Sequence, residues 1–331
     1  MLLIPKNADA IAIDWVTIGD PGNAADTDPL GYGAVAESFQ IMKYEFTNRQ
    51  YSEFLNAVAR TDAFSLYNGD LRVGITRNGT SGSYVYAVKA GMSDKPVIFV
   101  SWFDAARVAN WLTNGATETS STESGAYTLV NGQVSGTAPA RNEGANFYIP
   151  TQHEWYKAAF YKGSGTNSGY WKYSTQSDIA PSESAGYGPY GNSANYNQWP
   201  GGGVTAVGRN GGPSAYGAYD MSGNASEWND WDATASVNRV RRGGDWADSL
   251  SFYVSSKGSV INLPNFEGVN AGFRLASPVA VPEPSTWVMA AGGLACTACR
   301  AFGRRRAGLS PSVNRTTDQN AADESPVVPR S

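Results

Sequence analysis

The segment from Tyr216 to Trp228 holds the residues best suited to chemistry. Asp220, Asn224 and Glu227 place three oxygen-bearing side chains within eight residues of a glycine-containing stretch. Carboxylate, amide and backbone oxygens in such a loop suit a hard cation such as calcium. The spacing does not match an EF-hand loop, which needs oxygen ligands at alternate positions and a glycine at the sixth. The alternative is a capped turn whose carboxylates accept hydrogen bonds from backbone N–H groups.

The scarcity of cysteine and histidine excludes several kinds of site. The only cysteines, Cys296 and Cys299, lie near the C-terminus, so the preceding chain can form neither a disulfide nor a thiolate metal site. The only histidine, His153, excludes a multi-histidine metal centre within one chain. We expect His153 to be an exposed polar residue rather than a catalytic one. The net charge of −4 gives no electrostatic reason to expect nucleic acid as a partner.

Composition indicates a globular protein rich in loops. Of the 331 residues, 16% are charged and 37 are glycine, which leaves little material for long charged helices. The 18 tyrosines and 10 tryptophans are expected to be buried between irregular segments. The length allows one large domain or two ordinary ones.

Three helices are predicted by one repeated pattern at their N-termini. In each, a serine or threonine is followed three residues later by an acidic or amide side chain, and apolar residues at helical spacing come next. The pairs are Thr47 and Gln50, Ser101 and Asp104, and Thr151 and Glu154. These capping boxes fix where the helices begin.

Short strands and long loops make up the rest of the body. Residues 11–18, 40–45, 96–100, 147–149 and 271–276 are predicted strands because they are short apolar or alternating runs. Two polar stretches between them, 113–146 and 162–213, are predicted surface loops. Loops of that length in a compact domain usually bind something or are held by ions.

The character of the chain changes at Ser277. Residues 281–284 read Val-Pro-Glu-Pro, a stiff linker without helix capacity, and residues 285–299 are small and apolar. Arg304, Arg305 and Arg306 follow, as expected for a membrane-spanning segment whose C-terminal side stays cytoplasmic. The alternative is a short helix followed by a solvated basic patch. Residues 307–331 are polar and are expected to be disordered.

Five segments taken together resemble the formylglycine-generating enzyme, or sulfatase-modifying factor, family. They are residues 96–112, 148–159, 216–228, 239–246 and 272–274, and they occur in the family's order. The resemblance covers roughly residues 11–277 and implies a single compact α+β domain of the C-type-lectin-like type. Short strands, three short helices, long loops and bound calcium are then expected.

The resemblance also implies ligands for calcium. The family's second calcium site matches Asp220, Gly223, Ala225 and Glu227, where the glycine and alanine would supply backbone carbonyls. The family's other site falls near residues 195–196, but its downstream acidic ligand has no clear counterpart in this sequence.

One departure from the family concerns its chemistry. Oxidase members bind copper(I) through two cysteines and convert a sulfatase cysteine to formylglycine, whereas Asp248 and Tyr253 stand at those positions here. Soft copper(I) requires thiolate or thioether ligands, so copper is not expected. Iron-dependent relatives use several histidines, which this chain lacks.

The C-terminal segment resembles the Pro-Glu-Pro sorting signal read by exosortases in Gram-negative bacteria. Residues 281–287, the apolar run and the arginine cluster match its three parts. The expected partners are the exosortase machinery and an unknown surface ligand or peptide, with transient membrane anchoring before release to the cell surface or extracellular matrix. Residues 1–6 show no charged n-region, so no signal peptide is visible there.

The sequence thus predicts a lectin-like domain over residues 11–277, a sorting segment over 278–306 and a tail over 307–331. The first functional hypothesis is a calcium-stabilised binding or matrix protein without oxidase activity. The rival is an oxidoreductase with an atypical active site, either a formylglycine generator with different chemistry or a hydroxylase-like relative. Its cleft would be lined by Asp248, Ser249, Tyr253, Trp246 and Arg242. A third option is a degenerate paralogue with a purely structural role.

Overall fold

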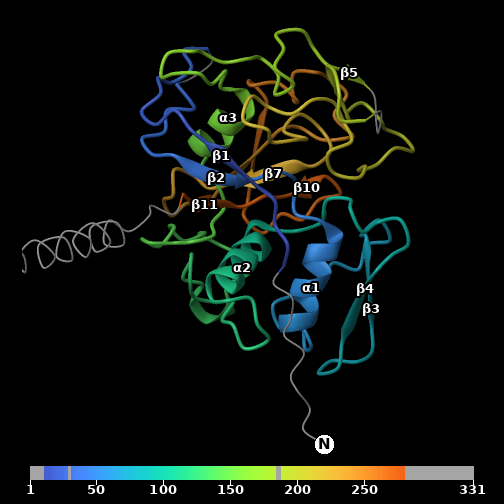
Figure 1. The fold of residues 1–331 in the computed structure, drawn as a ribbon. Helices are drawn as coiled ribbons and strands as arrows, with labels where there is room; N and C mark the ends of the chain where they lie inside the picture. The colour runs from blue at the N-terminus through green and yellow to red at the C-terminus, as the bar shows by residue number, and fades with distance from the viewer. Residues whose placement is uncertain (1–10, 29–30, 184–187, 280–331) are drawn as a thin grey trace, which may run out of the picture. The chain divides into compact units, whose positions relative to one another are not determined.

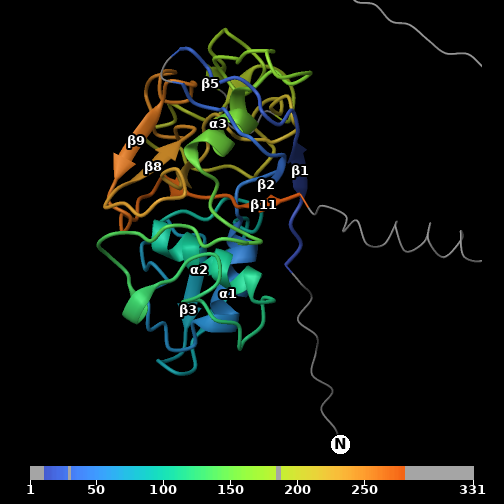
Figure 2. The same ribbon diagram turned by 90° about the vertical axis from the view of Figure 1, so that its left-hand side faces the viewer.

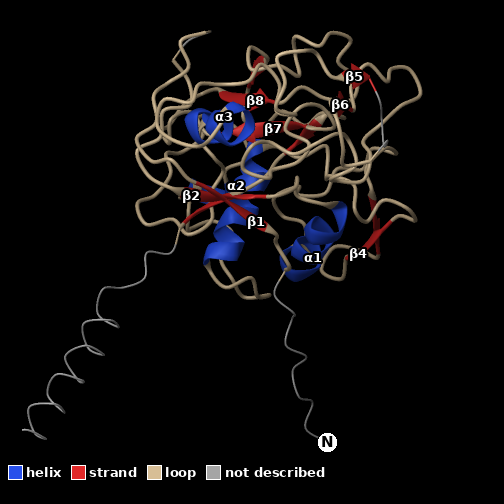
Figure 3. Ribbon diagram, turned by 45° about the horizontal axis from the view of Figure 1, so that its top comes forward, coloured by secondary structure: helices blue, strands red, loops and turns tan. Residues whose placement is uncertain are grey.

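The computed structural model describes residues 11–28, 31–183 and 188–279. The sorting segment beyond Val279 and the tail at 307–331 lie outside the described residues. Short helices and strands are joined by long loops throughout the described part (Figure 3). None of its helices is long and apolar enough to cross a membrane.

All three predicted helices are confirmed, together with their starting points. The helices are α1 (Asn48–Val58), α2 (Trp102–Thr113) and α3 (Gln152–Phe160). In each, the capping side chain accepts from the third N–H of the helix, and the third side chain accepts from the capping residue's own N–H. This reciprocal pairing depends only on residues three apart, which is why the sequence predicts it.

The strands form two principal sheets. The first contains β1 (Trp15–Ile18), β2 (Phe39–Met42) and β11 (Ala276–Pro278), in the order β1-β2-β11 and antiparallel throughout. The second has the order β10-β7-β8-β9, with β7 (Ser226–Asn229), β8 (Arg239–Arg242), β9 (Ser259–Asn262) and β10 (Ala271–Gly272). The first sheet brings the first and last strands of the domain together on either side of β2.

Two small strand pairs and a short helical turn complete the elements. They are the hairpin β3 (Ile75–Asn78) with β4 (Val85–Val88), the pair β5 (Ser182–Glu183) with β6 (Ser193–Ala194), and a 3-10 turn at Val130–Gly132. Strands β1, β2 and β11 lie across the middle of the domain. Helix α3 is on one side of them, and α1 and α2 are on the other (Figure 1; Figure 2).

Several predicted strands are wrong. Residues 96–100 are buried but form no strand, because the backbone bends at Phe99, whose φ is +60°, and the N–H groups bond to loops. Val97 donates to the carbonyl of Phe46, and Phe99 donates to that of Gly268. Residues 147–149 contribute only an isolated bridge from Tyr148 to Ala276. The predicted strand 271–276 is two strands, β10 and β11, in different sheets.

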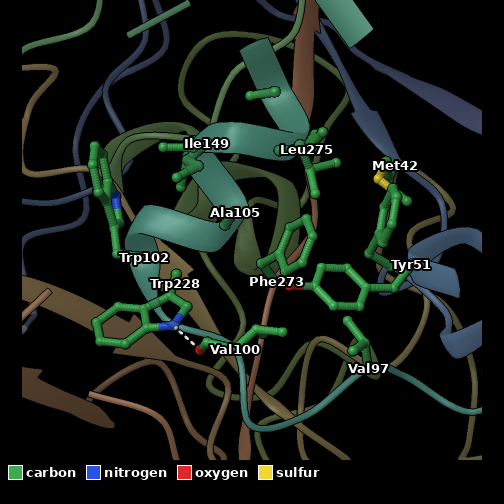
Figure 4. Packing of buried hydrophobic residues seen from close by; sticks show 14 of the residues in the cluster. Met42, Tyr51, Val97, Val100, Trp102, Ala105, Ile149, Trp228, Phe273 and Leu275 are labelled. Atoms are coloured by element: carbon green, nitrogen blue, oxygen red, sulfur yellow. Dashed lines mark hydrogen bonds between the residues drawn. The ribbon is translucent and has the colours of Figure 1, made fainter. Parts of the chain in front are cut away.

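The core is built from aromatic side chains carried by distant segments. Trp228 of β7 is fully buried, and its indole N–H donates to the carbonyl of Val100 at 2.9 Å (Figure 4). Trp102 of α2 is also fully buried in this cluster, and Phe273 stacks on Phe46 with ring centroids 4.9 Å apart. Aromatic pairs of this kind hold loops that have few ladder hydrogen bonds of their own.

A buried ion pair joins β7 of the four-stranded sheet to the loop between β10 and β11. Both oxygens of Glu227 accept from the Arg274 guanidinium at 2.6 Å, and neither side chain is exposed. Glu227 also accepts from the indole N–H of Trp155 at 2.7 Å, which links β7 to α3. Arg274 donates further to the carbonyls of Met42 and Tyr219. A buried pair whose other donors and acceptors are satisfied is costly to break on one side only.

Replacement of Glu227 by glutamine should destabilise the domain strongly. The variant removes the carboxylate that is hydrogen-bonded to the buried Arg274 guanidinium, and breaking such a buried pair on one side costs about 3–5 kcal/mol of the free energy of unfolding. Urea denaturation of the full chain measures this change. The matched control is Asp94→Asn, since Asp94 pairs with Arg49 at 3.8 Å on the exposed surface and such pairs contribute less than about 1 kcal/mol. Equal effects in the two variants would contradict the importance of the buried pair.

Candidate functional site

The predicted calcium turn is buried and tightly packed. The Asp220 carboxylate accepts from the N–H of Gly208 and from the side-chain amide of Asn210, the latter at 2.9 Å. Gly223 has a φ of +92°, and a Cβ there would lie 2.6 Å from the carbonyl oxygen of Asn195. Only glycine fits that position, because both the backbone angle and the close approach exclude a side chain.

A third carboxylate, which the sequence did not predict, also contacts this turn. Glu45 lies beyond β2, is fully buried, and accepts from the N–H of Ala225 at 2.9 Å and from the side-chain amide of Asn224 at 2.7 Å. Burial raises the pKa of Glu45 well above its usual value, and the negative charges of Asp220 and Glu227 raise it further. The available signal was an acidic residue at the end of the predicted strand 40–45, directly before Phe46.

The carboxylates outnumber the cation that faces them. Glu45, Asp220 and Glu227 share the single guanidinium of Arg274, which lowers the pKa of Glu45 while the two acids raise it. Burial also raises the pKa of Asp220 to about 6. The turn therefore carries an excess of buried negative charge, a condition that a bound cation or a proton relieves.

The fit of calcium to this turn is mixed. In the described part of the chain, no three acidic, cysteine or histidine side chains are grouped so as to hold a metal ion. A calcium ion would therefore need the backbone carbonyls of Gly223 and Ala225, and it would share Glu227 with Arg274. The side-chain oxygen of Asn195, whose backbone carbonyl accepts from Asn224, is buried without a hydrogen-bond partner. Calcium at this turn stays a prediction.

A second polar cluster lies where the oxidase family has its copper cysteines. Asp245 accepts from the N–H of Ala247 at 2.9 Å and from the amide of Asn270 at 2.7 Å. Asp248 accepts from the N–H of Asp245 at 2.9 Å. Arg241 of β8 bonds to the side chains of Asn262 and Asn270 at 3.1 and 3.4 Å. The cluster thus combines two carboxylates, two amides and one buried guanidinium.

The two aspartates of this cluster have perturbed acidities. Burial and the neighbouring charge of Asp245 raise the pKa of Asp248 to about 7. Burial likewise raises the pKa of Asp245, although hydrogen bonds and Arg241 oppose the change. Burial lowers the pKa of Arg241 to about 10. Carboxyl groups that titrate near neutral pH can hold a proton or a cationic ligand.

An aromatic pair borders the cluster. Trp246 is buried, and Trp199, which is 61% exposed, lies over it with ring centroids 5.7 Å apart. The loop that carries Trp199 is fixed to the cluster because Asn197 and Gln198 donate their N–H groups to the carbonyls of Asp248 and Trp246, each at 2.8 Å. An exposed indole on a fixed loop is a typical contact for a ligand or partner.

The structure brings together only part of the cleft predicted for an enzyme. Trp246 and Asp248 are in the cluster, and Ser249 is exposed beside them. Arg242 points away: its guanidinium lies 4.4 Å from the Tyr32 ring and donates to Gln152. Neighbouring strand residues face opposite sides, so Arg241 takes the place expected for Arg242.

Tyr253 and His153, which the sequence analysis also singled out, make packing and hydrogen-bond contacts outside the cluster. The ring of Tyr253 packs against that of Phe252, with centroids 5.6 Å apart. His153 is partly buried rather than exposed: its Nδ1 accepts from the N–H of Gly33 at 3.2 Å, and its Nε2 lies 3.6 Å from a carboxylate oxygen of Asp232. These contacts give His153 a role in holding the loop around Gly33.

Replacement of Asp248 by asparagine should stabilise the protein at pH 8 more than at pH 5. The folded state raises the pKa of Asp248 from 3.8 to about 7, so ionisation above pH 7 opposes folding, and protonation removes this cost as the pH falls. Thermal unfolding of variant and wild type at several pH values gives the difference. Asp94→Asn, at an exposed ion pair, is the control for the exchange of a carboxylate for an amide. A larger gain for Asp248→Asn at pH 5 than at pH 8 would have the wrong sign.

Comparison with known proteins gives the family and the fold. The sequence matches the sulfatase-modifying factor enzyme 1-like domain over residues 19–279 and the PEP-CTERM protein-sorting motif over residues 280–306. No curated protein matches the sequence. The crystal structure of CarF is similar at 22% identity, with 81% of this chain and 99% of CarF covered and a TM-score of 0.50.

Two other solved structures are similar over comparable lengths. Treponema denticola variable protein 1 shares 19% identity, with 80% of this chain and 95% of that chain covered and a TM-score of 0.49. PvdO from Pseudomonas aeruginosa shares 20% identity, with 81% and 92% covered and a TM-score of 0.46. The similarity to CarF and the observed elements confirm the predicted single α+β domain. Because the family match spans residues 19–279, this chain belongs to the sulfatase-modifying factor enzyme 1-like family, with a PEP-CTERM sorting motif directly after the domain.

Proposed function

We propose that this chain is a surface-sorted binding or matrix protein without copper-oxidase activity. The PEP-CTERM motif indicates export, surface sorting in a Gram-negative bacterium and processing by an exosortase. The observation that carries the non-oxidase assignment is the cluster around Asp248, where carboxylates and a guanidinium replace thiolates. With no cysteine before Cys296, the domain offers copper(I) no thiolate.

The loops around this cluster support a binding role. A core of buried aromatic side chains holds them, so their surface is fixed without regular secondary structure. Exposed apolar side chains gather in the chain segments that flank the cluster. These are Trp199, Leu250, Phe252, Ile261 and Leu263. Binding residues commonly lie on loops positioned by a rigid scaffold, and aromatic anchors supply much of the affinity at interfaces.

The rival enzyme hypothesis has one observation in its favour. The negative charge of Asp245 raises the pKa of Asp248, and a pKa of about 7 for Asp248 suits a general acid or base at neutral pH. No nucleophilic thiol or imidazole accompanies them in the cluster. A tightly bound redox metal in the purified protein would favour the enzyme, whereas calcium alone would favour the binding protein.

Calcium at the central turn is a second proposal, supported by charge. Three buried carboxylates face one guanidinium, and the Asn195 side-chain oxygen has no partner among the described residues. Asp220 and Glu227, with the carbonyls of Gly223 and Ala225, would hold the ion. Bound there, calcium would neutralise the excess charge and stabilise the folded state.

Removal of calcium by a chelator should lower the melting temperature of the full chain. An ion that binds only the folded state adds a few kcal/mol at about a hundredfold excess over its dissociation constant. Differential scanning fluorimetry with and without added calcium measures the shift, and elemental analysis of the same sample identifies the metal. Asp220→Asn should reduce the shift in melting temperature. Asp178→Asn, at an exposed loop position, should leave the shift unchanged. An unchanged melting curve would mean that Arg274 and the amide donors alone hold the turn.

The protein recovered from the cell surface should be processed and should lack oxidase activity. In an exosortase-bearing host, mass analysis should place its C-terminus near Pro282–Pro284, because the sorting motif is removed there.

Incubation of this material with copper(I), oxygen and a sulfatase-type cysteine peptide should leave the peptide mass unchanged. An authentic copper-cysteine member of the family serves as the positive control. Aldehyde formation above background would overturn the non-oxidase assignment, and intact chains ending at Ser331 in the cytosol would overturn surface sorting.

A further inference from the structure

A small cavity borders Trp246. Its volume is about 180 Å³, and Trp246 forms one wall. Ile98, Val204 and Val269 give it apolar lining, and Met92 adds a flexible apolar side chain. A space of this size admits a single side-chain-sized group rather than a nucleotide or an oligosaccharide, since drug-sized ligands occupy about 300–1,000 Å³.

Two basic side chains, Arg72 and Lys95, also line this cavity. Arg72 is balanced by Asp70, to which it donates two hydrogen bonds at 2.9 Å, and its guanidinium lies 5.1 Å from the Phe99 ring. Lys95 is different. In the described ranges its ammonium group has neither an ion-pair nor a hydrogen-bond partner, while its backbone N–H donates to Met92 and its carbonyl accepts from Asn48. Lys95, which is half-exposed, is therefore the one basic residue of the lining without a counter-ion in the described part of the chain.

The glycine and tryptophan residues of the lining are held in place by close packing and hydrogen bonds. Gly202 packs so tightly that a Cβ there would lie 2.3 Å from the Cβ of Gln198, and its N–H donates to the carbonyl of Gln198 at 2.8 Å. Gly203 accepts from the side-chain amide of Asn195 at 3.0 Å. The indole N–H of Trp246 donates to the carbonyl of Val269 at 3.3 Å, which fixes the aromatic wall. The cavity is thus formed before any ligand arrives, so binding needs little reorganisation.

We propose that this cavity binds a compact apolar group that bears a carboxylate. The apolar body would fill the space between Trp246, Ile98 and Val204, and the carboxylate would face the ammonium group of Lys95. A cationic ligand is disfavoured by the two basic side chains. A neutral apolar ligand would leave Lys95 without a counter-ion. The ligand chemistry has two possible sources, a free small organic acid or the C-terminal residue of a peptide.

This inference does not rest on the function proposed for the Asp245–Asp248 cluster. The ligand is selected by Lys95 and the apolar lining, and neither aspartate lines the cavity. A negative result for carboxylates would leave the absence of oxidase chemistry and the surface sorting untouched.

Isothermal titration of the full chain with benzoate and 3-methylbutanoate tests the first source. Each should bind saturably at one site, and the matching neutral amides should bind about tenfold more weakly or worse, because hydrogen bonds to charged groups contribute about 1.5–3 kcal/mol. Lys95→Gln should lower the affinity for the acids by about tenfold or more without changing the affinity for the amides. Lys172→Gln is the matched control, since Lys172 does not line the cavity, and its affinities should equal those of the wild type.

A second titration distinguishes the sources. Short peptides that end in free valine or phenylalanine are compared with the same peptides amidated at the C-terminus. Tighter binding of the free-carboxylate peptides than of the small acids identifies a peptide terminus as the ligand, and the reverse identifies a free acid. Thermal melting of Lys95→Gln confirms that the variant is folded. Equal binding of acids and amides, an unchanged affinity in Lys95→Gln, or no binding of either class at millimolar concentration would overturn the proposal.

Discussion

The ion pair between Glu227 and Arg274 is the constraint on which the rest of the domain depends. It is fully buried, and its two residues bond to β2, α3 and the loop at Tyr219. A domain with so little regular structure has few ladder hydrogen bonds to fix its topology. A buried guanidinium, with its several donors, connects one carboxylate with carbonyls of two other segments and so reinforces the short pairings of β10 with β7 and of β11 with β2. Its position determines where the central turn can lie.

The same pair leaves the turn with more negative than positive charge. Burial raises the pKa values of Glu45 and Asp220, the neighbouring carboxylates add to this, and Arg274 opposes the change only in part. Buried charge of this kind lowers the stability of the folded state unless a proton or a cation is bound. The turn that resembles a family calcium site is therefore also the place where this chain has most to gain from a cation.

Around Asp248 the family's scaffold carries two carboxylates and a guanidinium. Hydrogen bonds from Asn197 and Gln198 hold the loop against the Asp248 backbone, so the geometry of the site does not depend on thiolates. The groups that remain are hard, charged and partly desolvated, and an exposed tryptophan lies beside them. Such a surface suits recognition of a charged or polar partner better than oxygen chemistry with a soft metal.

The sequence by itself determined the features that depend on neighbouring residues. The capping boxes at Thr47, Ser101 and Thr151 predicted all three helix starts, because each involves groups three residues apart. The family motifs predicted the fold and the turn at Gly223. Tertiary structure decided the partners. Glu45 reaches Ala225 across 180 positions, and neither local spacing nor periodicity encodes such a contact. The choice of Arg241 over Arg242 followed from strand alternation, which becomes visible only when β7 and β8 pair and one face of the sheet turns toward the site.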